Sequence, residues 1–172
     1  MRGSMHLTLG VAAGMSAAAL QIADPAAGVA FAAACTVGSL FPDIDIGSSK
    51  ISHKMRVTSF FISHIFGHRG FFHSPLCCGL LSYGLYQILV NSDVANAAFI
   101  AQGFAVGFLL HLVQDTLTYK GVPWFWPLPF KLHLTKFQSK SPLCWALTLI
   151  LIAVWVIVLC MIPGSRLGGL FL

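Results

Sequence analysis

The chain has 172 residues, of which 57% are apolar and only 9% are charged, whereas about 25% of residues are charged in soluble domains. So few charges cannot cover a water-soluble protein of this length, and the mean hydropathy of +0.83 also indicates lipid as the main solvent. The net charge of +5 fits basic residues beside anionic headgroups. No basic stripe interleaved with aromatic residues is present, so we do not expect nucleic-acid binding.

Five apolar stretches predict five membrane-spanning or half-spanning helices, because exposed backbone is not tolerated in lipid. The first three stretches are short for the hydrocarbon core, so each must take in flanking residues or lie in a thinned region. We therefore expect an all-α fold, a polytopic membrane helical bundle, with residues 1–172 forming a single integral membrane domain. The stretches cover residues 8–22, 26–41, 76–90, 94–113 and 143–162.

Short polar motifs indicate where these helices begin. Asp24, Ser74 and Ser141 each precede a proline, the combination of a capping side chain and a favourable first helical residue. Ser92 or Asp93 is expected to cap the fourth helix. The aspartates at 24 and 93 are therefore assigned to helix caps.

Small residues predict close packing between helices. The first helix carries Gly10-xxx-Gly14 and the fourth carries Gly103-xxx-Gly107. The five cysteines lie inside apolar runs, and we expect them to pack as small apolar residues rather than to form disulfides or bind metal.

Lysines and arginines indicate the orientation in the membrane. Segments 43–73 and 115–140 hold four such cations each, and Arg2 precedes the first helix, whereas Arg166 alone lies on the other side. By the positive-inside rule the cation-rich side is cytoplasmic and the C-terminus is outside.

Histidines and aspartates gather on that same side, at the ends of four helices. His111 and Asp115 are four residues apart and share a helix face, and Asp43 and Asp45 point the same way if their segment is extended. Imidazole and carboxylate ligands suit zinc, with manganese or iron as alternatives. Because one zinc needs three or four protein ligands, seven candidates predict two ions, or three. The candidates are His6, Asp43, Asp45, His68, His73, His111 and Asp115.

Each motif alone also has an ordinary interpretation. The pair at 111 and 115 fits a solvated helix end, the pair at 43 and 45 fits a turn, and the histidines at 68 and 73 fit a headgroup interface. Their convergence from four helix ends favours the metal site. We expect loop or surface roles for His53, His64 and His133, with His64 as a reserve ligand.

An aromatic segment follows the fourth helix. Trp124 and Trp126 flank a phenylalanine, and Lys131 and Lys136 lie downstream. This composition is typical of an anchor at the membrane–water interface, and we expect the segment to have that role. The alternative is that it forms an approach route for substrate.

Four motifs carry a resemblance to a known family: His6, Pro42-Asp-Ile-Asp45, His68-Arg-Gly-Phe-Phe-His-Ser74, and His111-Leu-Val-Gln-Asp115 followed by Gly121. They resemble the YdjM-type family, described as LexA-regulated, membrane-bound, metal-dependent hydrolases. The resemblance covers a metal-site core at about 6–127 and leaves the extra C-terminal helix at 143–162 outside. The family is considered distantly similar to zinc-dependent phospholipase C and P1-type nucleases, which implies phosphoester hydrolysis.

The expected function is therefore a hydrolase at the cytoplasmic face of the bacterial inner membrane, acting on a phosphoester or lipid-like ester. Asp45 is expected to be a further ligand or the general base, and Arg69 to stabilise developing phosphate charge. Membrane lipids are the expected partners, and an oligomer is compatible with the short helices. A membrane metal transporter or metal-binding regulator with the same ligands is the alternative, although transport favours polar groups at mid-membrane. A structural protein with incidental histidines is the third possibility.

Overall fold

The computed structural model describes residues 1–45, 70–135 and 141–162, except for the side chains of residues 44 and 45. Two short 3-10 helices, η1 (Phe41–Asp45) and η3 (Phe71–His73), follow α2 and precede α4. Within the described part there is no strand, and one isolated bridge pairs Val122 with Leu132. The prediction of an all-α fold is confirmed. The α-helices are α1 (Gly3–Gln21), α2 (Pro25–Leu40), α4 (Pro75–Asn91), α5 (Ala97–Thr116) and α6 (Leu143–Met161).

Among the described residues, four helices are long and apolar enough to cross a membrane by length and composition: α1, α2 extended to Asp43, α5 and α6. The first two reach this length by taking in flanking residues, as predicted for short apolar stretches. With 17 residues, α4 is about 26 Å long and slightly shorter than the hydrocarbon core of about 30 Å. The chain is therefore a helical membrane bundle.

Two of the predicted helix starts, at Asp24 and Ser74, have the expected cap, whereas α6 begins one residue later than predicted, with Pro142 as its N-cap. The Asp24 carboxylate accepts hydrogen bonds from two backbone N–H groups in the first turn of α2, at 3.1 and 3.2 Å. The Ser74 hydroxyl accepts from the backbone N–H of Cys77 at 3.1 Å, and the Ser141 hydroxyl accepts from that of Leu143 at 3.3 Å. These bonds satisfy N–H groups that have no partner inside a helix.

The expectation that Ser92 or Asp93 caps α5 is wrong. The N-cap of α5 is Asn96, which has a left-handed φ of 61° and makes no side-chain cap bond. Ser92 instead follows the last turn of α4, and Asp93 has a φ of 50° in the connection. The tight turn between two antiparallel helices is thus made by left-handed backbone, which asparagine and aspartate tolerate better than most residues.

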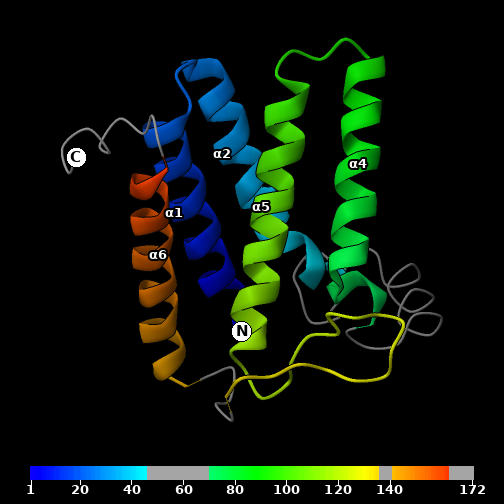
Figure 1. The fold of residues 1–172 in the computed structure, drawn as a ribbon, viewed down its shortest axis with the longest axis vertical. Coiled ribbons are helices and arrows are strands. Elements are labelled where there is room, and N and C mark those ends of the chain that lie inside the picture. The colour runs from blue at the N-terminus through cyan, green and yellow to red at the C-terminus, as the bar shows by residue number, and fades with distance from the viewer. Residues whose placement is uncertain (46–69, 136–140, 163–172) are drawn as a thin grey trace.

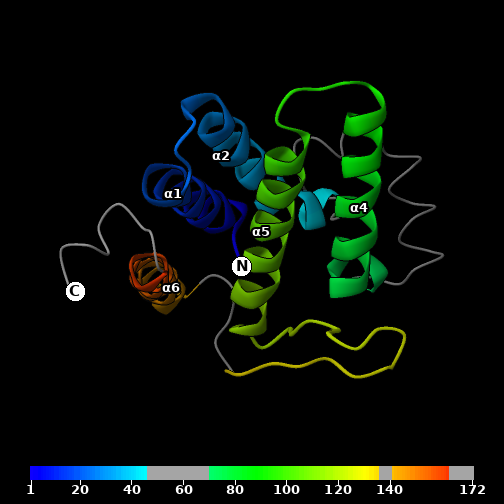
Figure 2. The same ribbon diagram turned by 45° about the horizontal axis from the view of Figure 1, so that its top comes forward.

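Successive helices run in alternate directions, so their ends collect at two sides of the bundle (Figure 1). The N-terminus of α1, the C-terminal end of α2, the start of α4 and the end of α5 lie at the same side, at the bottom of Figure 1. α2 packs against α1 and α5, α5 also packs against α4, and α6 packs against α1 on the outside (Figure 2). We call the bottom side the site end.

Glycines bring α1, α2 and α5 into close contact. A Cβ atom at Gly103 or Gly107 of α5, or at Gly38 of α2, would collide with a backbone carbonyl of the facing helix. On α1, a Cβ atom at Gly10 would collide with the Ser39 side chain of α2, and one at Gly14 would collide with the Ala32 backbone. Both small faces predicted from the sequence therefore lie in helix contacts. Four of the five cysteines are buried in apolar clusters, as expected.

Candidate metal centre

Five of the seven candidate ligands meet at the site end. They form two overlapping groups, one of His6, His111 and Asp115, and one of Asp43, His73 and His111, and within each group the ligand atoms lie within 4.8 Å of one another. Four of the five side chains are fully buried, and Asp43 is 18% exposed. His111 belongs to both groups and stands between the two carboxylates.

The helix periodicity explains how the ligands reach this place. On α5, positions 103, 107, 111 and 115 are each four residues apart and share one face. The first two positions are glycines that let α2 approach, and the last two are the ligands His111 and Asp115. On α1, His6 precedes Gly10 by the same interval. Each glycine face therefore continues into a ligand face.

The distances between these atoms match metal ligation better than hydrogen bonding. Nε2 of His6 lies 3.4 Å from Oδ1 of Asp115, and Nε2 of His73 lies 3.7 Å from Oδ1 of Asp43. Nε2 of His111 lies 3.8 Å from a carboxylate oxygen of each aspartate. Hydrogen bonds from ring nitrogen to oxygen measure about 2.7–3.2 Å. By contrast, two ligands held at about 2.1 Å by one tetrahedral ion lie about 3.4 Å apart.

Several atoms of the cluster have no hydrogen-bond partner among the described residues. They are both ring nitrogens of His6 and of His73, Nε2 of His111, and Oδ1 of Asp43. Leaving one buried polar atom unsatisfied costs about 1–3 kcal/mol, so a group of them needs a compensating partner. A divalent cation bound by these lone pairs would satisfy them together. The residues present therefore fit a metal ion.

Ser39 orients the central histidine. Its backbone carbonyl lies 2.7 Å from Nδ1 of His111. A carbonyl oxygen accepts and cannot donate, so Nδ1 carries the proton and the lone pair of Nε2 points at the two carboxylates. Fixing the tautomer through the other ring nitrogen is the usual way in which proteins prepare a histidine for metal binding.

Ring contacts hold the histidines together. The His6 and His111 rings stack with centroids 3.7 Å apart and an angle of 15° between their planes, and His73 meets His111 edge-on at 5.5 Å. The α-amino group of Met1 forms an ion pair with Asp115. The imidazoles therefore pack against one another, while Asp115 lies beside the Met1 α-amino group and Asp43 lies beside the His73 and His111 rings.

The remaining predicted site residues are not described. The backbone of Asp45 ends η1, but its side chain lies outside the described part, as do His68 and Arg69. Of the histidines left outside the site, His133 is exposed in the segment after α5 and belongs to neither ligand group. His53 and His64 also lie outside the described residues.

Two polar residues beside the cluster were missed from the sequence. Besides Ser39, Gln114 is fully buried, and its Nε2 atom donates a 2.7 Å hydrogen bond to the Thr148 hydroxyl of α6. The same atom lies 3.4 Å from the carbonyl oxygen of Met5 on α1. An amide directly before Asp115 in an apolar helix was the available signal, because polar groups in membrane helices face protein rather than lipid.

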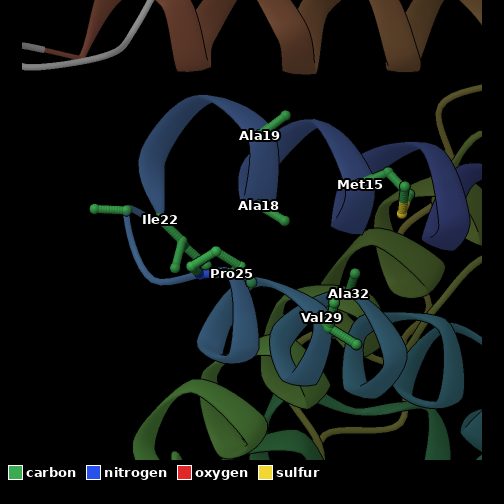
Figure 3. Close-up of a pocket in the computed structure, with 9 residues that line it drawn as sticks. Met15, Ala18, Ala19, Ile22, Pro25, Val29 and Ala32 are labelled. Carbon is green, nitrogen blue, oxygen red and sulfur yellow. The ribbon is translucent and has the colours of Figure 1, made fainter.

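An apolar pocket of about 250 Å³ lies between α1 and α2 (Figure 3). Its lining includes Met15, Ala18, Ile22 and Val29, all from the half of each helix that is remote from His6 and Ser39. No ionisable side chain lines it. This pocket is therefore separate from the cluster of histidines and aspartates.

Comparisons with known proteins agree with the membrane fold. A family model described as YdjM inner membrane protein matches residues 1–167, which include all five clustered residues. The uncharacterized protein YvsG of Bacillus subtilis (strain 168) is 31% identical over 141 residues, 82% of either chain. The inner membrane proteins YdjM of Escherichia coli (strain K12) and Shigella flexneri are each 37% identical over 95 residues, 55% of this chain and 48% of theirs. No solved structure matches the chain significantly.

Proposed function

This chain belongs to the YdjM family of inner membrane proteins, and we propose that it is a membrane-embedded metal-dependent hydrolase of phosphoesters or lipid-like esters. The observation that carries the proposal is the set of 3.4–3.8 Å separations among buried imidazole nitrogens and carboxylate oxygens. Such separations leave the atoms too far apart to satisfy one another and fit a shared divalent ion.

The described residues supply the ligands of one ion around His111. One imidazole nitrogen has one lone pair, so Nε2 of His111 serves a single ion even though it belongs to both groups. We propose zinc, because three imidazoles and two carboxylates are its usual donors, with manganese or iron as alternatives. A second ion would take ligands from Asp45 and His68.

A divalent ion, when bound, polarises a phosphoryl oxygen and lowers the pKa of water toward neutrality. The chain's own residues would supply the rest of the chemistry. Asp43 is the member of the cluster with an exposed portion, so substrate and water would approach from its side. Asp45, two residues later, would accept the proton, and Arg69 would hold two phosphate oxygens with its planar guanidinium.

The depth of the cluster supports an ester at the headgroup level. α5 has 20 residues and is about 30 Å long, the thickness of the hydrocarbon core. Asp115 and His111 occupy its last two turns, close to the boundary with the headgroups. A transporter would need its ligands near mid-membrane. We propose that the site end is cytoplasmic, because Arg2 directly precedes α1 and the exposed Lys120 and Lys131 follow α5.

The first test is elemental analysis of detergent-purified protein. Wild type is compared with the Asp43→Ala/His111→Ala variant and with His133→Ala, which removes an exposed histidine outside the cluster. We expect bound zinc or manganese in wild type and His133→Ala and its loss from the double variant. No metal in wild type, after reconstitution with several divalent metals, would refute the metal site.

Hydrolysis is tested on the same proteins. Phospholipid vesicles and bis(p-nitrophenyl) phosphate are the substrates, and we expect turnover in wild type and His133→Ala but not in the double variant. The opposite outcome is that wild-type protein binds metal and carries it into sealed vesicles, yet hydrolyses none of a range of phosphoesters and carboxylic esters. That result would refute the hydrolase and support a metal transporter.

A further inference from the structure

We propose that residues 117–135, here called the platform, bind to the surface of the anionic lipid leaflet at the site end. This binding would set how deep the metal centre lies relative to the lipid headgroups. The platform follows α5 directly and leads toward α6. It runs along the end of the bundle below α4 and α5, as the yellow segment of Figures 1 and 2 shows. The proposal does not depend on hydrolysis.

The platform lies at the plane of the headgroups. α5 ends at Thr116 after 20 residues, which is about 30 Å and one hydrocarbon thickness. A segment that begins at residue 117 and runs across the end of the bundle therefore lies along the membrane–water boundary rather than deep in either phase.

The inner side of the platform is fastened to the bundle. Val122 is fully buried in the apolar cluster around Phe108, and its backbone forms two hydrogen bonds with Leu132. The indole N–H of Trp124 donates to the Thr116 hydroxyl at 2.8 Å, and the Leu134 N–H donates to the Thr116 carbonyl at 2.9 Å. The segment thus has a defined structure with one face against protein.

The outer side exposes large apolar side chains. Phe125 is 60% exposed and Leu134 is 66% exposed. Exposing a group of large apolar side chains to water is unfavourable. The same side chains are stable in the interfacial region of a bilayer, where aromatic residues are enriched. The exposed large apolar residues of the platform are Tyr119, Phe125, Leu128, Phe130, Leu132 and Leu134.

The charge of the platform selects an anionic surface. Lys120 and Lys131 are exposed, and residues 117–135 contain no aspartate or glutamate. Basic residues beside apolar ones bind leaflets rich in anionic lipid, because the surface potential attracts the cations while the apolar groups enter the acyl boundary. A second copy of this chain, which has a net charge of +5, would match the apolar residues but would not offer an anionic surface to the two lysines.

The platform also contacts an element that carries a ligand. The Trp126 ring meets the Phe71 ring edge-on, with centroids 5.1 Å apart. Phe71 begins η3, and His73 ends it. With Trp124 bonded to the last residue of α5, the platform touches both elements that hold the His73 and His111 imidazoles. Its seating would therefore fix how far the centre lies from the headgroups.

The test measures membrane depth by spin labelling in the full-length protein. Phe125→Cys, Leu128→Cys and Phe130→Cys are labelled one at a time with a nitroxide in a Cys160→Ser background, since the other four cysteines are buried. Ser92→Cys, in the exposed turn at the opposite end, is the control. Collision with oxygen and with a water-soluble nickel chelate is measured in phosphatidylcholine vesicles with and without phosphatidylglycerol.

We expect the ratio of oxygen to nickel collisions to be several-fold higher at the platform positions than at residue 92, and higher again with phosphatidylglycerol. The Lys120→Gln/Lys131→Gln variant should lose the increase caused by phosphatidylglycerol. Ratios at the platform as low as at residue 92 would show that it lies in water and would overturn the proposal. Labels that collide with neither reagent would show that a protein partner covers the platform. A collision ratio that does not change when phosphatidylglycerol is added would refute the preference for an anionic leaflet.

Discussion

The Nδ1 atom of His111 lies 2.7 Å from the carbonyl oxygen of Ser39, and this hydrogen bond spans the contact between α5 and α2. The two helices approach closely enough for the bond because Gly107, one turn before His111, faces the backbone of Cys35 and Ser39. Helix packing and ligand orientation therefore depend on the same contact, and a change in one should alter the other.

Replacing Gly107 with alanine tests this dependence. The added Cβ would collide with the Cys35 carbonyl and the Ser39 nitrogen, so α2 and α5 must separate. We expect a loss of about 1–3 kcal/mol in stability, as for an overpacked core, together with a lower zinc content. The control is Gly84→Ala on α4, where a Cβ meets nothing within 4 Å. Thermal unfolding in detergent and elemental analysis measure the two effects. Equal behaviour of both variants would contradict the role of the contact.

The central position of His111 predicts unequal effects of the three histidines on metal binding. His111→Ala removes the ligand shared by both groups, whereas His6→Ala or His73→Ala removes a ligand of one group. We expect zinc binding to be lost in the first variant and to persist at lower affinity in the other two. Equilibrium dialysis against a series of zinc concentrations gives the affinities. A His6 or His73 variant as impaired as His111→Ala would rule out this central role.

The bond between Gln114 and Thr148 should hold α6 to the bundle. Thr148→Val removes the 2.7 Å hydrogen bond and leaves the Gln114 amide without its partner on α6. Hydrogen bonds between membrane helices contribute about 0.6 kcal/mol on average and at most about 1.7 kcal/mol, so we expect a loss in that range. Thr36→Val is the matched control, because the Thr36 hydroxyl bonds within its own helix. Unfolding in mixed detergent measures the difference, which should vanish in a Gln114→Leu background.

The two aspartates at the end opposite the site should differ in their effect on stability. Asp24→Ala removes the acceptor of two N–H groups in the first turn of α2 and is expected to cost about 1 kcal/mol. Asp93→Asn should cost less than about 0.5 kcal/mol, because Asp93 does not cap α5 and asparagine also tolerates the left-handed backbone at this position. Melting temperatures of the two variants give the comparison. A loss for Asp93→Asn as large as that for Asp24→Ala would show that the turn before Asn96 depends on the Asp93 carboxylate.

The membrane fold could be predicted from the sequence because it depends on local features, namely the length of each apolar run and the capping residues at helix starts. Runs such as 143–162 are apolar for the length of a bilayer, and the starts at Asp24 and Ser74 carry capping chemistry. The order of the runs then places His6, Asp43, His73 and His111 at one side, since consecutive spans must alternate in direction. Spacing by four residues put His111 and Asp115 on one face for the same local reason.

The contacts between helices were decided by the tertiary structure. Most side chains of these helices are apolar because lipid, not water, surrounds them, so the apolar pattern does not reveal how each helix is rotated. Glycine spacing and a few polar residues indicate which face packs against protein, but not which atoms of the neighbouring helix they meet. Neither the sharing of His111 by two groups, nor the tautomer set by Ser39, nor the bond from Gln114 to Thr148 could be derived from periodicity. The left-handed Asn96 turn also depends on how α4 and α5 pack. What the sequence determined was which residues reach the site end, and what packing decided was which atoms meet there.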